Sequence, residues 1–199
     1  MRGTLIWALV AIAILMPSGL ALSSPLLQWR QPVYIIAGFA GVVGMTLLLL
    51  QPLLVRGVLP GFAAMRGRRA HRFVGAALVL AVVVHVVGLW ITSPPDVVDA
   101  LTFTSPTPFS AWGVIAMWAI FGAALLAVLR RRAGIRLGLW RIAHTALAVV
   151  IVVGTVIHAV LIEGTMETVS KIGLAGLVLI ATGVVIADLR GWFRRAPSR

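Results

Sequence analysis

The sequence predicts an all-α integral membrane protein, a six-helix transmembrane bundle, on three observations. Of its 199 residues, 61% are hydrophobic and 11% are charged, with a mean hydropathy of +1.08, whereas about a quarter of the residues in a soluble domain are charged. Six apolar runs approach or exceed the roughly 20 residues that a helix needs to cross a bilayer. The net charge of +12 comes from short basic clusters between these runs, which is typical of membrane loops. It does not form a nucleic-acid-binding face.

The six predicted spans are bounded by clusters of Arg, Pro and Gly. They cover residues 3–22, 33–55, 70–91, 111–129, 139–162 and 172–189. The longest connection, residues 92–110, contains four prolines and cannot form one continuous helix. We therefore expect one membrane domain, residues 1–199, without a soluble part.

The first span permits two interpretations. Arg2, the apolar stretch after it and the small residues from Pro17 to Ser23 also describe a secretory signal peptide. The near full span length of residues 3–22 favours a retained helix. Removal of this segment would leave the topology of the other five spans unchanged.

The distribution of charge predicts the orientation, because Arg and Lys near span ends stay on the cytoplasmic side. With the N-terminus inside, 15 of the 17 basic residues lie in inner segments, and only Arg30 and Lys171 lie in outer ones. Four of the five acids lie in the outer segments: Asp96, Asp99, Glu163 and Glu167. Five tryptophans lie at span ends, where indoles prefer to sit: Trp29, Trp90, Trp112, Trp140 and Trp192. Both termini are therefore predicted to be cytoplasmic.

Several classes of chemistry are excluded. The chain has no cysteine, so it forms no disulfide, thiolate metal site, iron-sulfur cluster or thiol nucleophile. It also lacks a Ser-His-Asp arrangement, a carboxylate pair inside a span and a phosphate-binding glycine loop, which argues against a hydrolase or a nucleotide enzyme. Metal or redox chemistry must therefore use His, Met, carboxylates or a bound cofactor.

All four histidines lie in two spans, His71 and His85 in the third, His144 and His158 in the fifth. Fourteen helical steps fall about 40° short of four full turns and rise about 21 Å. Both histidines of a span therefore face the same side, one near each membrane surface. Because the two spans run in the same direction, His71 shares a depth with His144, and His85 with His158. If the helices face each other, the imidazoles form two cross-helix pairs.

Such pairs favour haem binding. Two imidazoles fill both axial positions of a haem iron, which favours electron transfer over oxygen binding. Without cysteine there are no thioether links, so two haems of type b are expected, forming an electron path across the membrane. The alternative is a haem-free transporter or assembly protein whose histidines pack or relay protons. Within the spans, however, Asp188 is the only acid.

Residues near the histidines add to this pattern. Arg-x-Ala-His precedes each inner position, at Arg68 to His71 and at Arg141 to His144. Arg69, Arg72 and Arg141 are candidate partners of haem propionates, although cytoplasmic flanks alone would also place arginines there.

The glycines and the outer acids each have two readings. Three glycines lie on the histidine-bearing faces, where they would either make room for a macrocycle or permit close helix packing: Gly75, Gly88 and Gly154. The outer acids would capture a metal near the exit haem or, as we favour, are simply solvated.

The six-span layout, with histidines separated by thirteen residues on the third and fifth spans, resembles the ferric reductase-like transmembrane domain. This superfamily includes ferric-chelate reductases, NADPH oxidases and the haem subunit of the bacterial methionine sulfoxide reductase system. The segments from Arg68 to Gly75 and from Leu139 to His144 resemble its inner helix starts. The resemblance implies that His71 and His144 bind the inner haem b and that His85 and His158 bind the outer one. It also implies an oxidoreductase component in a plasma membrane, the inner membrane in a bacterium.

The sequence departs from the larger members at its C-terminus. Those continue into a flavin and nicotinamide domain, whereas this one ends ten residues after the last predicted span. The immediate electron donor is therefore open: a separate flavoprotein, a membrane quinol or a domain outside this sequence. FAD and NAD(P)H, if they take part at all, are expected only through a separate partner. The expected function is electron transfer from a cytoplasmic donor, a flavoprotein or a quinol, to an outer acceptor such as ferric iron or oxygen. A quinol-linked haem subunit serving a periplasmic reductase is the alternative, although four intact histidines favour the ferric reductase type.

Overall fold

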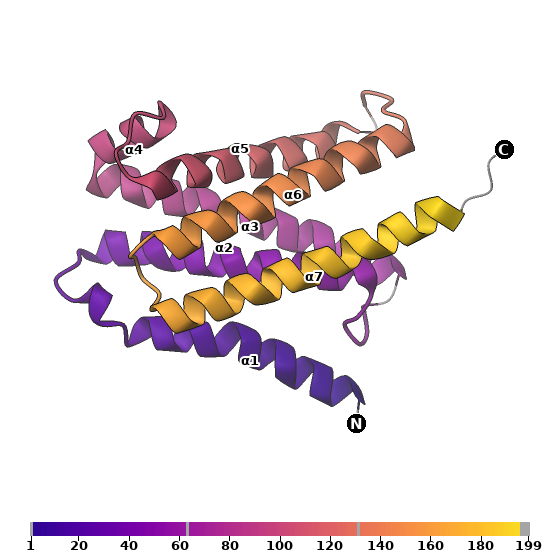
Figure 1. Ribbon diagram of the computed structural model, residues 1–199, viewed down its shortest axis with the longest axis horizontal. Helices are drawn as coiled ribbons and strands as arrows, with labels where there is room; N and C mark the ends of the chain where they lie inside the picture. The colour runs from indigo at the N-terminus through magenta and orange to yellow at the C-terminus, as the bar shows by residue number, and fades with distance from the viewer. Residues whose placement is uncertain (1, 63, 131, 196–199) are drawn as a thin grey trace.

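The computed structural model describes residues 2–62, 64–130 and 132–195, and these residues form helices and connections without a strand (Figure 1). Of the basic residues predicted on the inner side, Arg131 and Arg199 lie outside the described ranges. The helices in chain order are α1 (Arg2–Leu22), a 3₁₀ turn η1 (Pro25–Leu27), α2 (Pro32–Arg56), α3 (Ala64–Thr92), α4 (Pro94–Leu101), α5 (Pro108–Leu129), α6 (Leu137–Leu161) and α7 (Thr168–Arg195).

Six of these helices, all except α4, are long and apolar enough to cross a membrane. The number and order of the predicted spans are confirmed. The helix starts have local causes, because α2 and α5 each place a proline in the first turn, where its missing N–H is not needed. α3 begins at Ala64, six residues before the predicted span, because the arginine-rich segment before residue 70 continues the helix.

The connection between α3 and α5 contains a short helix that was not predicted. As expected, residues 92–110 do not form one helix, but Pro94 and Pro95 start α4 in the positions where prolines are tolerated. The Ser93 hydroxyl donates to the Asp96 carboxylate at 2.6 Å in the first turn. Val97 is buried, so α4 lies across this end of the bundle with an apolar side inward.

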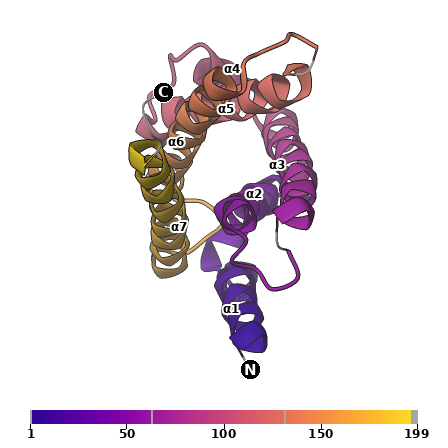
Figure 2. The same ribbon diagram turned by 90° about the vertical axis from the view of Figure 1, so that its right-hand side faces the viewer.

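The helices α2, α3, α5, α6 and α7 are arranged in a ring, and α1 lies outside this ring (Figure 2). α2 packs along α3, and α5 along α6, while α7 contacts α2 and α6 and α1 lies against α7 and α2. α1 begins and α7 ends at the same side of the molecule (Figure 1). We call this side the arginine-rich end, because it holds Arg56, Arg66, Arg68, Arg69, Arg72, Arg130, Arg132, Arg136 and Arg141. The opposite side, with η1, α4 and the α6–α7 connection, is called the loop end.

Apolar side chains form both the core and the outer surface. The core contains Met45 of α2, Leu78 of α3 and Ile120 of α5, together with Leu174 and Val178 of α7, which are fully buried. Many large apolar side chains are exposed on the outside of the helices. Backbone groups satisfied within helices and apolar groups facing outward are what a bilayer requires. The protein is therefore a multi-pass membrane protein. At the arginine-rich end, Arg56 and Asp188 form an ion pair of 3.1 Å between α2 and α7.

Candidate functional site

The four histidines meet in two pairs between α3 and α6. The ring centres of His71 and His144 are 6.2 Å apart near the arginine-rich end. Those of His85 and His158 are 6.4 Å apart near the loop end. The planes of the rings cross at 73° and 83°, respectively. The structure thus brings together the histidines that the sequence predicted to share a depth.

The histidines of the loop-end pair are oriented by backbone carbonyls of neighbouring helices. His85 Nδ1 lies 2.7 Å from the carbonyl oxygen of Ala37 on α2, and His158 Nδ1 lies 2.9 Å from that of Phe109 on α5. Because a carbonyl can only accept, each Nδ1 carries the proton and donates it. The lone pair is then on Nε2, on the other side of the ring. This is the arrangement in which a histidine is held ready to bind a metal.

A glycine lies one helical turn beyond each of these carbonyls. A Cβ at Gly41 would lie 3.2 Å from His85 Nδ1, and a Cβ at Gly113 would lie 2.7 Å from His158 Nδ1. We call each combination of carbonyl and glycine a histidine seat. The sequence analysis missed both glycines. Aligning α2–α3 with α5–α6 would have found them, since Gly41 precedes His85 by 44 residues and Gly113 precedes His158 by 45.

The glycines singled out from the sequence contact neighbouring helices. A Cβ at Gly88 would lie 2.7 Å from Ala37 Cβ, and one at Gly154 would lie 3.0 Å from the Trp112 carbonyl oxygen. These two therefore allow close helix packing, the second of the two interpretations left open by the sequence. Gly75 faces the side-chain nitrogen of Gln51, 3.3 Å from the position of its Cβ.

The pair at the arginine-rich end has aromatic and cationic neighbours. Trp140 stacks on His144, with ring centres 5.1 Å apart and planes at 13°. The guanidinium of Arg130 lies 4.8 Å from the centre of a Trp140 ring. Arg130, at the end of α5, therefore contacts Trp140, which in turn contacts His144. Arg130 was not among the predicted site residues.

Several buried polar atoms in this region have no hydrogen-bond partner in the described part of the chain. They are Gln51 Oε1, His71 Nδ1, Trp140 Nε1, His144 Nδ1 and Thr182 Oγ1. Buried polar groups are normally paired, whereas both imidazoles of this pair have an Nδ1 atom without a partner among the described residues.

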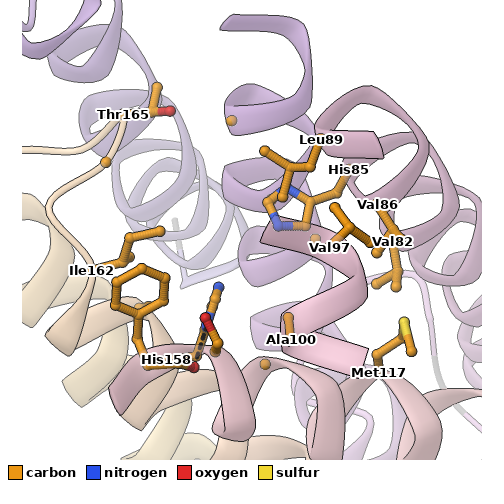
Figure 3. Close-up of a pocket in the computed structure, with 18 of the residues that line it drawn as sticks. Val82, His85, Val86, Leu89, Val97, Ala100, Met117, His158, Ile162 and Thr165 are labelled. Carbon is orange, nitrogen blue, oxygen red and sulfur yellow. Dashed lines mark hydrogen bonds between the residues drawn. The ribbon is translucent and has the colours of Figure 1, made fainter. Parts of the chain in front are cut away.

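A cavity of about 660 Å³ contains the loop-end pair (Figure 3). His85 and His158 line it together with apolar residues of α2, α3, α4, α5 and α6, including Val82 and Leu89 of α3 and Met117 of α5. The volume is within the usual range of ligand pockets, about 300 to 1,000 Å³. Charged side chains line the cavity as well: Arg30, Asp96, Asp99 and Lys171. Glu163 and Glu167 are not among the lining residues. α1 contributes nothing to the lining.

The predicted arginines lie in the first few turns of α3 and α6, beside the histidine pair at the arginine-rich end. All four arginines, Arg68, Arg69, Arg72 and Arg141, are exposed. Arg69 lies two residues before His71 and Arg72 one residue after it, so helical spacing directs both away from the histidine face. Arg68 and Arg141 each precede a histidine by three residues and share its face.

These features define a class of protein: a six-span membrane protein with two histidine pairs enclosed between its helices. The family model of the ferric reductase like transmembrane component matches residues 37–155, more than half of the chain. The chain therefore belongs to the ferric reductase-like transmembrane family. The matched region includes His71, His85 and His144, and His158 follows it by three residues. Searches of curated proteins and of solved structures each found no match.

The histidine pairs fit the haem that members of this family generally bind. Among the described residues, no group of three or more His, Asp or Glu could hold a bare metal ion. Two imidazoles suffice for a haem iron, because the porphyrin supplies the other four nitrogens. A metal lies about 2.0 Å from an imidazole nitrogen, which lies about 1.1 Å from its ring centre, given ring bonds of about 1.3 Å. Opposed axial imidazoles then have ring centres roughly 6.2 Å apart, compared with 6.2 and 6.4 Å here.

Proposed function

We propose that this protein carries electrons across the membrane, one at a time, through two haems b. His71 and His144 would bind one haem, and His85 and His158 the other. The main support is the presence of two imidazole pairs, with ring centres 6.2 and 6.4 Å apart, in a member of the ferric reductase-like family. Haem supplies the one-electron chemistry when it is bound.

The residues of the chain then have separate tasks. His71 and His144 would each supply a ring nitrogen. His85 and His158 would supply Nε2 lone pairs, because the carbonyls of Ala37 and Phe109 hold their Nδ1 protons. A ligand oriented in this way is also more basic, because its other nitrogen donates a hydrogen bond. Apolar side chains of the surrounding helices line the cavity around the loop-end pair. Arg68 and Arg141, on the histidine faces, are better placed than Arg69 and Arg72 to meet propionates, since helical position directs them there.

We propose that the arginine-rich end faces the cytoplasm, with both termini on that side. The support is the excess of Arg and Lys in cytoplasmic segments of membrane proteins. In a bacterium the membrane would be the inner one. Electrons would then enter at His71 and His144, from a flavoprotein attracted by the arginines or from a quinol, and leave at His85 and His158. Ferric iron or oxygen is the proposed acceptor. The whole chain, residues 1–199, would act as one haem domain.

The proposal is tested by counting haems in the purified full chain. We expect two haem b per chain in a pyridine haemochrome assay, with low-spin spectra. His85→Ala should reduce the count to one, because the two histidines of α3 are about 21 Å apart along the helix. His158→Ala should also retain one haem, with the same spectrum as the haem that remains in His85→Ala. A folded, colourless wild-type protein would refute the proposal, and loss of both haems from folded His85→Ala would refute the pairing.

A further inference from the structure

Lys171 is the only lysine of the chain, and its position is unusual for a charged residue. It lies in the first turn of α7 and is only 6% exposed. Its side chain lines the cavity that contains His85 and His158. Lysine is almost never buried to this degree unless it is paired with an opposite charge.

Lys171 has no ion-pair partner within 4.0 Å among the described residues, and its nearest electrostatic partner is Glu167. Lys171 Nζ donates to the carbonyl oxygen of Ile162 at 2.7 Å. An ammonium group has three protons to donate, and no carboxylate oxygen lies within 4.0 Å of Nζ among the described residues. The contact with Ile162 caps the end of α6, but a neutral carbonyl alone does not offset the cost of burying an ammonium ion.

Among the described residues, no acid of the loop end forms an ion pair with Lys171: Glu163 is exposed, and Asp96, Asp99 and Glu167 accept hydrogen bonds from other groups. The carboxylate of Glu167 accepts hydrogen bonds from the backbone N–H groups of Val169 and Ser170, at 2.7 and 2.8 Å, and from the Ser170 hydroxyl. Asp96 accepts from Ser93, and Asp99 accepts from Thr104 at 3.4 Å. The positive charge at Lys171 is therefore available to an anion that enters the cavity.

The position of this charge relative to the histidine pair suits a bound carboxylate. Ile162 follows His158 by four residues, which is about 6 Å along a helix axis. The Lys171 ammonium therefore lies about one helical turn from His158, toward the loop end. Arg30, whose guanidinium is 4.8 Å from the centre of the Tyr34 ring, lines the same cavity and is exposed. It provides a second cation at the cavity mouth.

We propose that Lys171 binds a carboxylate inside this cavity through a charge-assisted hydrogen bond, with Arg30 as a second, exposed partner. The inference rests on the proposed function, because the carboxylate belongs either to the edge of a porphyrin held by His85 and His158 or to a small anionic acceptor that reaches it. It adds a carboxylate site at the loop end to the arginines considered for the other end.

The test is a redox titration of the full, haem-loaded protein, in which the midpoint potentials of both haems are measured. Lys171→Met keeps the length of the side chain and removes the charge, and Lys171→Arg keeps the charge. We expect Lys171→Met to lower the potential of the loop-end haem, because a nearby positive charge favours the reduced form. The other haem should be unchanged, and Lys171→Arg should remain close to wild type.

Titrations at several pH values and with citrate separate the possible outcomes. If Lys171 binds a porphyrin carboxylate, the shift occurs without citrate and the Lys171→Met potential becomes dependent on pH near neutrality, because the freed carboxylate takes up a proton. If it binds an acceptor, added citrate shifts the wild-type potential but not that of Lys171→Met. A lower potential in Lys171→Met that depends on neither pH nor citrate would show that the lysine acts only through space, and it would overturn the proposal. Unchanged potentials in all conditions would overturn it as well.

A failure of the proposed function gives a different result. Wild-type protein without haem at the loop end would refute haem binding by His85 and His158, whatever the behaviour of Lys171. In that haem-free protein, calorimetric titration with citrate tests the lysine directly. Binding that is lost in Lys171→Met and kept in Lys171→Arg supports the carboxylate site, and equal behaviour of all three proteins overturns it.

Discussion

The histidines of the loop-end pair differ from those of the other pair in how their rings are held. His85 and His158 donate Nδ1 protons to carbonyls and lie against glycines 41 and 113. The ring of His144 is instead stacked on Trp140, and the Nδ1 atoms of His71 and His144 have no partner among the described residues. Hydrogen bonding directs the rings at one end, and packing directs that of His144 at the other.

The seat at Gly113 leads to a prediction about a single methyl group. In Gly113→Ala the new Cβ would lie 2.7 Å from His158 Nδ1, so the ring must move and its bond to Phe109 is lost. Changes in such supporting contacts typically reduce metal affinity by about 10- to 100-fold. We expect the loop-end haem to dissociate during purification, leaving one haem per chain.

The matched control for this substitution is Gly176→Ala. A Cβ at Gly176 in α7 meets no atom within 4 Å, so this variant should retain both haems. Gly41→Ala, with a less severe contact of 3.2 Å, should have a smaller effect than Gly113→Ala. Full retention of two haems in Gly113→Ala would contradict the role assigned to the seat.

Trp140 is predicted to orient His144. Trp140→Leu removes an aromatic stack that is worth about 0.5 to 1.5 kcal/mol, so affinity for the haem at the arginine-rich end should fall by about 2- to 12-fold. Trp140→Phe keeps a ring and should lose less. Competition for haem with apomyoglobin measures these affinities. Equal affinity in Trp140→Leu and wild type would show that the stack does not orient the ligand.

At the scale of elements, two helical hairpins repeat one design. α2–α3 and α5–α6 each begin with a proline-initiated helix that carries a seat, and each continues with a helix that carries two histidines. The second helix of each hairpin packs closely on the first through a glycine near the loop-end histidine, Gly88 or Gly154. The repeat explains why both imidazoles of the loop-end pair are held in the same manner.

The start of α7 is predicted to be stabilised by Glu167 in a pH-dependent way. Hydrogen bonds from the hydroxyl and backbone of Ser170 lower the pKa of this carboxyl below its usual range. A group with a lowered pKa in the folded state stabilises the fold above its unfolded pKa and loses this contribution as the pH falls through the folded pKa. Glu167→Gln should therefore lower the melting temperature at neutral pH.

In acid the difference between Glu167→Gln and wild type should disappear, because the wild-type carboxyl is then also neutral. Thermal unfolding in detergent between pH 7 and pH 3 measures this effect. Glu163→Gln serves as a control, because Glu163 accepts no side-chain hydrogen bond among those seen in the described residues. A difference that persists unchanged at pH 3 would contradict the role of the charge.

At the scale of the whole molecule, α1 lies outside the ring formed by the other long helices (Figure 2). α1 contacts α2 and α7 but does not line the cavity. The question of whether residues 3–22 are a retained helix or a signal peptide therefore does not affect the proposed electron path. The two ends of the bundle differ in charge, with arginines at one and most of the acids at the other.

This charge difference predicts the orientation in the membrane. A reporter fused after Arg132 should be cytoplasmic, and one fused near Asp99 should be external. Alkaline phosphatase and green fluorescent protein fusions report the two sides independently. The reverse result would exchange the entry and exit haems of the proposed path, without affecting the pairing of the histidines.

The sequence alone determined the six helices and which histidines share a depth. Three features carried this information: the length of the apolar runs, the prolines at helix starts and the fourteen-residue step between histidines. Each lies within one segment of the chain, so it can be recognised without knowing which other helices pack against that segment. The same local rules missed α4, whose prolines were read as breaking a helix when they begin one.

Only the tertiary structure decided how the rings are held and where an unpaired charge is buried. The seats at Gly41 and Gly113 and the Trp140 stack each depend on how neighbouring helices pack or on how a side chain turns. Lys171 reads in the sequence as an ordinary loop cation, and it becomes a cavity residue because α7 begins beside the end of α6. Such contacts join segments through helix packing, and hydrophobic periodicity specifies which face of a helix is apolar but not which atoms of another helix it will meet.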